Sequence, residues 1–188
     1  MMRRILTAGA CVVLLAACEK TTGPSNLAGT LIFIFTGGGG GTFSTSGIPP
    51  ANPEIPGTTN WAAAFQDPAA SQTGLAGIRI DTGATYDAVI LGLRRLTVGS
   101  AAVDADCDPN QSDCTGLLFV INGAGPDVAT FEFLCVLLSG TFTITEVSTR
   151  RAKGTFSGSG ECTNQALAVS AFSVSDGSFD VPLIPEPQ

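Results

Sequence analysis

Oxygen-bearing side chains recur at every second position in one short acidic segment of the chain. They belong to Asp104, Asp106, Asp108, Asn110 and Ser112. This alternation resembles the odd-numbered ligands of a calcium loop, and Ca²⁺ takes about six to eight oxygen ligands. An EF-hand is excluded, because Pro109 stands at its sixth position and Thr115 at its twelfth. The segment predicts either a calcium loop of another kind or an acidic, solvated loop.

Four cysteines follow position 100. Cys107 lies within this acidic segment, and Cys114 lies just after it. In an exported chain an even number of cysteines predicts disulfides, and three pairings are possible. We favour Cys107–Cys114, which closes a short loop, and Cys135–Cys162, which joins neighbouring strands. A zinc site is disfavoured, since the chain has no histidine and no C-x-x-C spacing.

Catalytic patterns are scarce. Without histidine the Ser-His-Asp and Cys-His systems are excluded. Glu132 and Glu146 form the best pair of carboxylates for glycoside hydrolysis, but alternation places Glu132 opposite Phe131 and Phe133, toward solvent. No helix pattern follows the glycines of 37–41, so they predict a flexible linker and not a dinucleotide site.

The N-terminus has the three parts of a lipoprotein signal. Arg3 and Arg4 precede an apolar run over 5–17, which is too short to span a bilayer permanently. Leu15-Ala16-Ala17-Cys18 then matches the lipobox of bacterial lipoproteins, in which the cysteine thiol takes a diacylglycerol. The motif predicts a lipidated Cys18, anchored by about 0.8 kcal/mol per buried methylene. Glu19 in place of aspartate favours sorting to the outer membrane.

The net charge and the composition of the chain limit the kinds of molecule that it can bind. Cleavage before Cys18 would keep all 16 acidic residues and remove two of the 9 basic ones, changing the net charge from −7 to −9. An acidic domain of this kind disfavours nucleic acid as a partner. Charged residues make up only 13 % of the chain, against a usual share of about 25 %, and small polar residues take their place, as in secreted β-proteins.

Short apolar runs separated by turn signals predict an all-β fold. We expect an antiparallel β-sandwich or meander barrel of about 8–10 short strands. Predicted strands cover 60–66, 74–81, 85–93, 117–122, 129–138, 140–147, 153–159, 167–174 and 178–184, with turns at Ser139-Gly140 and Arg150-Arg151. The β-rich run 31–35 is expected to pair. The predicted organisation is a signal peptide at 1–17, a lipidated tether at 18–29, a short strand and Gly/Pro-rich flexible segment at 30–58, the β domain at 59–184 and a tail at 185–188.

Three motifs carry a family resemblance. They are Trp61-Ala62-Ala63, Gly154-Thr155-Phe156-Ser157 and the run Asp176-Gly177-Ser178-Phe179-Asp180-Val181. In these the chain, over about residues 59–184, resembles small bacterial envelope lipoproteins grouped as domains of unknown function. The resemblance implies a β-meander at the cell envelope and supplies no catalytic residues. The cysteine pairs and the Gly/Pro-rich insert depart from that pattern.

Together these features predict a lipid-anchored envelope lipoprotein with a non-enzymatic binding or structural role. Its expected partners are the membrane, through Cys18, and an envelope protein or glycan. The alternative is a small hydrolase that uses acidic residues, or a calcium-dependent carbohydrate-binding protein. A cleft that gathers two buried carboxylates would favour the hydrolase.

Overall fold

The computed structural model describes residues 28–50, 59–67, 72–81, 85–94, 96–105, 107, 114–124 and 130–185. The predicted signal peptide, the lipobox with Cys18, most of the tether and the tail end (186–188) lie outside these residues. The described part of the chain consists of strands and their connections, and it contains no helix that could cross a membrane.

Ten strands form a single sheet. Their bounds are β1 Gly29–Thr36, β2 Gly41–Gly47, β3 Trp61–Asp67, β4 Gln72–Ile80, β5 Thr85–Leu93, β6 Gly99–Ala102, β7 Gly116–Ala124, β8 Phe133–Val147, β9 Arg151–Asn164 and β10 Val169–Pro185.

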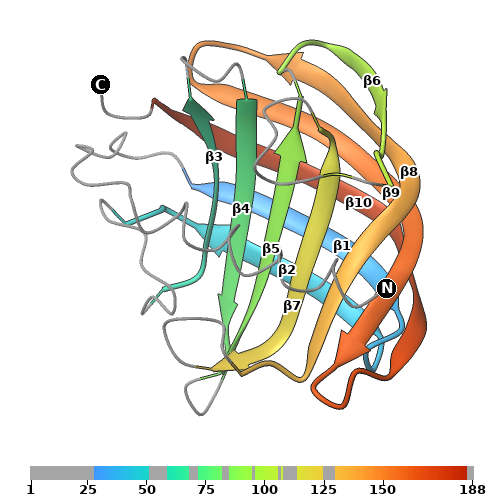
Figure 1. Cartoon of the computed structure of the whole chain (residues 1–188). Coiled ribbons are helices and arrows are strands. Elements are labelled where there is room, and N and C mark those ends of the chain that lie inside the picture. The colour runs from blue at the N-terminus through green and yellow to red at the C-terminus, as the bar shows by residue number, and fades with distance from the viewer. Residues whose placement is uncertain are drawn as a thin grey trace.

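Seven of these strands close into a barrel. Strands β3, β4, β5, β7, β8, β9 and β10 pair in that order, and β10 returns to β3 through a short parallel ladder at Leu183–Pro185. All the other pairs in the sheet are antiparallel. The predicted all-β fold is therefore confirmed, with one parallel seam that strand patterns did not predict (Figure 1).

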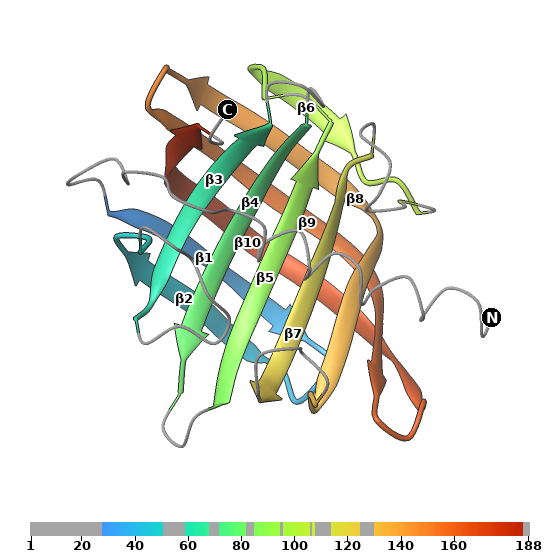
Figure 2. The ribbon, with the colours of Figure 1, turned by 60° about the vertical axis from the view of Figure 1, so that its left-hand side comes forward.

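The hairpin of β1 and β2 adds a second layer. Strand β1 pairs with β10, and β2 pairs with β1, so both cross behind β3, β4 and β5 at a steep angle (Figure 2). Thr45 of β2 ties the layers together by donating its hydroxyl to the carbonyl of Ile78 on β4, at 2.6 Å. A Cβ on Gly47 would lie 2.1 Å from the carbonyl oxygen of Asn60, so the close approach of β2 to the start of β3 requires glycine.

The core between the layers is aromatic. The inward residues of β1 alternate with exposed ones, so Leu31, Phe33 and Phe35 are buried while Ile32 and Ile34 face outward. Phe119 of β7 lies at the centre of a ring cluster with Phe33, Phe35, Phe43 and Phe172. This aromatic cluster fixes the distance between the layers, because its large rings are buried between them.

Two predictions about residues 30–58 are wrong. The glycines at 37–41 do not form a flexible linker but a tight turn, closed by a hydrogen bond from the amide of Gly40 to the carbonyl of Gly37 at 3.0 Å. Each of these glycines has a positive φ, which explains the residue type. Residues 41–47, predicted to be loop, form β2. The β domain therefore begins at Gly29 and not at residue 59; the predicted flexible residues 51–58 lie outside the described part.

The last strands are longer than predicted. The expected turn at Ser139-Gly140 lies inside β8, and the predicted break before Ser178 lies inside β10. Both positions are β-bulges, at Leu137/Ser139 and Val174/Gly177. A Cβ on Gly140 would lie 2.3 Å from the carbonyl oxygen of Ser157. Gly140 thus allows one continuous strand to bend closely against β9, and the chain does not reverse there. The turn at Arg150-Arg151 is present, as β9 begins at Arg151.

Candidate functional site

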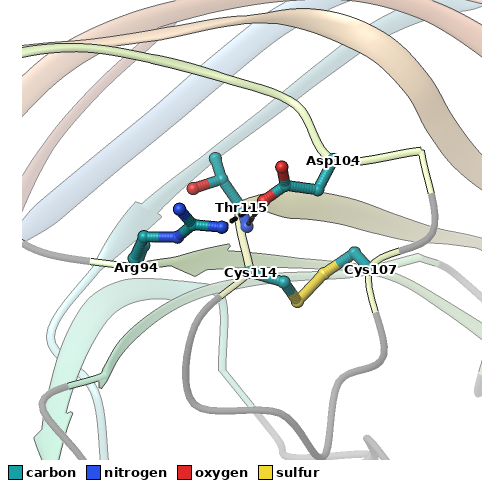
Figure 3. Close-up of a disulfide and its surroundings, with 5 residues drawn as sticks. All are labelled: Arg94, Asp104, Cys107, Cys114 and Thr115. Atoms are coloured by element: carbon teal, nitrogen blue, oxygen red, sulfur yellow. Dashed lines mark hydrogen bonds and ion pairs between the residues drawn. A yellow bond between two sulfur atoms is a disulfide. The ribbon is translucent and has the colours of Figure 1, made fainter.

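The acidic loop closes against the barrel through Asp104 and a disulfide (Figure 3). Asp104 follows β6, and its amide donates to the carbonyl of Thr115 at 2.8 Å. Its carboxylate accepts the amide of Thr115, also at 2.8 Å, and lies 3.4 Å from the guanidinium of Arg94. The amide of Cys107 then donates to the carbonyl of Asp104, and Cys107 is bonded to Cys114. Asp104 therefore serves as the clamp at the base of this loop.

This arrangement bears on the predicted calcium ligands. Of the five, only Asp104 is described; Asp106, Asp108, Asn110 and Ser112 lie outside the described residues. Within the described part no group of three or more acidic, cysteine or histidine side chains is placed to hold a metal. The carboxylate of Asp104 already faces a cation, and a guanidinium beside a ligand repels Ca²⁺. The calcium loop stays a prediction, with Arg94 as the competitor of the metal.

Calcium titration of the protein by calorimetry tests this prediction. A calcium loop would give heat for one site, and Asp106→Ala combined with Asp108→Ala would abolish that heat. Arg94→Gln should tighten the binding, because it removes the competing charge from Asp104. Absence of heat in both the wild-type protein and Arg94→Gln would leave the segment as an acidic loop closed by a disulfide.

A separate cleft opens at the rim of the barrel, between the end of β7, the segment before β8 and the turn between β9 and β10. Its volume is about 460 Å³. The lining combines amides, a hydroxyl, a carboxylate and one half-buried aromatic ring, from Asn122, Thr130, Phe131, Glu132, Asn164, Gln165 and Ala166. Most of these residues are polar, so the cleft offers hydrogen-bonding groups beside a single aromatic ring.

Hydrogen bonds hold the polar groups of this rim cleft in place. The amide group of Asn122 donates to the carboxylate of Glu132 at 2.5 Å. The hydroxyl of Thr130 donates to the carbonyl of Ala124, and the side chain of Asn164 accepts the amide of Ala168. Asn122 has a φ of 50° and lies inside β7, where the pairing with β5 shifts register at a bulge. The cleft is thus a polar surface whose side chains are held by hydrogen bonds, and Phe131 contributes an aromatic ring to its lining.

The two glutamates of the hydrolase alternative are not brought together. Glu132 is exposed, as predicted, and lies one residue before β8, whereas Glu146 lies near the far end of that strand, 2.9 Å from Lys153. At about 3.3 Å per residue, β8 is several times longer than the roughly 5–10 Å that separate glycosidase carboxylates. They therefore cannot act as the acid and base of one site. Phe131 and Phe133 also do not share one face, since β8 begins only at Phe133 and the two rings pack against different clusters.

Asp87 is the one carboxylate buried near the rim among the described residues. It is 2 % exposed, forms an ion pair with Arg79, and accepts the amide of Asn122 at 2.9 Å. Arg79 also lies over the ring of Phe43 and donates to the carbonyl of Thr42. Burial raises the pKa of Asp87 above the ordinary aspartate value, although the amide of Asn122 and the charge of Arg79 oppose the shift. Asp87 lies on β5 and connects it to β4 through Arg79 and to β7 through the amide of Asn122. Its carboxylate is buried and already paired, so its role is to stabilise the rim.

The raised pKa of Asp87 predicts a pH dependence of stability. The unfolded state has the ordinary aspartate pKa of about 4, and the folded state has a higher one. At pH values between these two pKa values, Asp87 binds more protons in the folded state than in the unfolded state. Stability conferred by this group is therefore present at the acidic end and falls as the pH rises through the folded pKa. Urea unfolding from pH 3.5 to 7 should show this decline in the wild-type protein and a flatter profile in Asp87→Asn. An equal slope in both proteins would assign the decline to other groups.

The chain was compared with protein families, curated proteins and solved structures. No protein-family model, curated protein or solved structure matches the chain. The site is therefore defined by its own residues. Sequence reasoning missed the rim cleft, because Asn122 and Asn164–Ala166 are about 40 positions apart and only the barrel brings them together. The single local signal was the Asn122-Gly123 pair, a common turn sequence.

Proposed function

We propose that this protein is a lipid-anchored lipoprotein of the bacterial cell envelope, with a non-enzymatic binding or structural role. The observation that carries the proposal is Leu15-Ala16-Ala17-Cys18, preceded by an apolar run and two arginines. These elements stand in the order that lipidation and cleavage require. The three motifs shared with envelope lipoproteins of unknown function support the same assignment.

The position of the barrel fits such an anchor. The described chain begins at Ala28, one residue before β1. Residues 18–27 would thus link the lipid to the barrel, and at about 3.3–3.6 Å per residue these residues span at most about 36 Å. That length holds a domain beside the membrane surface and leaves it free to turn. Glu19 favours the outer membrane as its location.

A binding role is favoured over catalysis by the rim cleft. Its amides, its carboxylate and the ring of Phe131 suit a polar ligand such as a glycan or a loop of an envelope protein. The chain has no histidine, and the two glutamates considered for hydrolysis lie toward opposite ends of β8. These features support recognition by a fixed surface.

Lipidation is tested by expressing the full chain in a diderm bacterium fed labelled palmitate. The wild-type protein should carry the label and sediment with membranes, whereas Cys18→Ala should lose the label and keep its signal segment. Cys11→Ala is the matched control and should remain labelled, because Cys11 lacks the leading leucine of the lipobox. Label retained in Cys18→Ala would refute the anchor assignment.

A further inference from the structure

The rim cleft lies where the segment before β8 runs antiparallel to the end of β7. The amide of Ala124 donates to the carbonyl of Thr130 at 2.9 Å, and the amide of Glu132 donates to the carbonyl of Ile121 at 3.0 Å. These two hydrogen bonds hold the segment against β7. The side chains of Thr130 and Glu132 therefore line the cleft together with that of Asn122.

Three side-chain oxygens of this cleft remain as hydrogen-bond acceptors. The hydroxyl of Thr130 uses its only proton on the carbonyl of Ala124, at 2.7 Å. The Oε2 atom of Glu132 accepts the side-chain amide of Asn122. The Oε1 atom of Glu132 and the Oδ1 atom of Asn122 have no donor among the described residues. The cleft thus offers a ligand several acceptors, two of them on side chains that are bonded to each other.

The carboxylate of Glu132 has no basic partner in the part of the chain that the structure describes. Most of the other described carboxylates have one, as in the pairs Asp81–Arg79, Asp87–Arg79, Asp104–Arg94, Asp180–Arg151 and Glu146–Lys153. Among the described residues that line the cleft there is no arginine or lysine. The negative charge of Glu132 therefore attracts a cationic ligand and repels an anionic one.

We propose, building on the binding role proposed for this cleft, that it binds the ammonium group of an amino sugar. An ammonium group has three N–H donors and no acceptor. It therefore matches the free acceptors of Glu132, Asn122 and Thr130, and it neutralises the carboxylate through a charge-assisted hydrogen bond.

The rest of the lining favours a sugar over a lysine side chain. Asn164 and Gln165 enter the cleft from the turn between β9 and β10 (Figure 2). The Oδ1 atom of Asn164 accepts the amide of Ala168, so its amide nitrogen is left to donate. Sugar hydroxyls both donate and accept, which suits such amides, and the ring of Phe131 offers apolar surface to a sugar ring. A lysine side chain has no hydroxyl and would leave these amides unpaired.

The size of the cleft fits a short oligosaccharide. Its volume of about 460 Å³ lies within the range of about 300–1,000 Å³ for small-ligand sites.

Calorimetric titration of the protein expressed from the full chain tests this inference, in a non-ionic detergent at about pH 6, where glutamate is ionised. The probes are a glucosamine trimer, which carries ammonium groups, an N-acetylglucosamine trimer, a galacturonate trimer and a short lysine peptide with blocked ends. Glu132→Gln removes the charge and keeps the shape of the side chain. Glu161→Gln is the matched control, because Glu161 is exposed on β9 and does not line the cleft.

We expect the wild-type protein to bind the glucosamine trimer at least about tenfold more tightly than the N-acetylated trimer or the lysine peptide. The galacturonate trimer should give no heat. Glu132→Gln should weaken binding of the glucosamine trimer about tenfold, whereas Glu161→Gln should match the wild-type protein. Thermal unfolding verifies that both variants fold.

Two results would overturn the ammonium assignment and still leave a binding role for the cleft. They are equal wild-type affinities for the glucosamine and N-acetylated trimers, and unchanged glucosamine binding in Glu132→Gln. Tighter binding of the lysine peptide would overturn the choice of a sugar. Absence of heat with all four probes would overturn the whole inference, whereas the membrane anchor is decided separately by the labelling of Cys18.

Discussion

Replacement of Phe119 by alanine is expected to lower the free energy of unfolding by about 4 kcal/mol, the range for a large aromatic residue removed from a core. Phe119 is fully buried and lies on β7, a strand of the barrel that faces the β1–β2 hairpin. Its ring lies 5.1 Å from those of Phe33 and Phe35 and 5.4 Å from that of Phe43, centroid to centroid. All three belong to the β1–β2 hairpin, so alanine would leave a cavity between the hairpin and the barrel.

Urea unfolding with the disulfides intact measures this effect. Phe119→Leu is the matched variant, since it keeps most of the volume and loses only the edge-to-face contacts, and it should cost about 1.5 kcal/mol. Phe131→Ala, in the lining of the rim cleft, is a second comparison and should cost less than Phe119→Ala, because Phe131 is only half-buried. Similar losses in Phe119→Ala and Phe131→Ala would mean that the layers are not held by the aromatic cluster.

Removal of the Cys135–Cys162 disulfide is expected to lower the free energy of unfolding by about 3.6 kcal/mol, from the loop-closure entropy of a cross-link with a sequence separation of 27. These cysteines face each other across β8 and β9, and both are fully buried. Alanine at both positions leaves the ladder of backbone hydrogen bonds intact. The loss should therefore come chiefly from the larger freedom of the unfolded chain.

The Cys107–Cys114 disulfide is the internal control. Its sequence separation is 7, so the same relation gives about 2.5 kcal/mol for its removal. It also lies outside the β8–β9 ladder, at the base of the acidic loop. Thermal and urea unfolding of the two double-alanine proteins should rank them in this order. A larger loss from Cys107→Ala with Cys114→Ala would indicate that the acidic loop supports the barrel more than its position suggests.

Local residue patterns were sufficient for the parts of the fold that depend on neighbours in sequence. Short apolar runs bounded by turn residues located β3, β4, β5 and β7 within a few positions, because strands buried on both faces are apolar at nearly every position. The spacing of the cysteines favoured the two disulfides that the structure contains. The apolar run 31–35 was expected to pair, and it does so with both β2 and β10.

The wrong predictions for 30–58 and for Ser139-Gly140 arose because glycine occurs in several kinds of local structure. At 37–41 and at Gly140 the same residue type that marks a linker or a turn serves a tight hairpin and a bulge. Which of these forms depends on what packs against the glycine, here β10 and β9, and that contact is remote in sequence. Strand β6 was missed for a related reason: Gly99–Ala102 is exposed throughout and has no apolar periodicity.

The amino-acid sequence by itself determined the all-β class and the approximate positions of most strands, since both depend on residues within about 20 positions of one another. The calcium loop and the export and lipidation signal stay predictions. Only the tertiary structure decided the parallel seam between β10 and β3, the rim cleft at Asn122 and Glu132, and the separate apolar cluster around Trp61. These features arise from closure of the sheet into a barrel, which fixes which strands are neighbours and which face of each strand points outward.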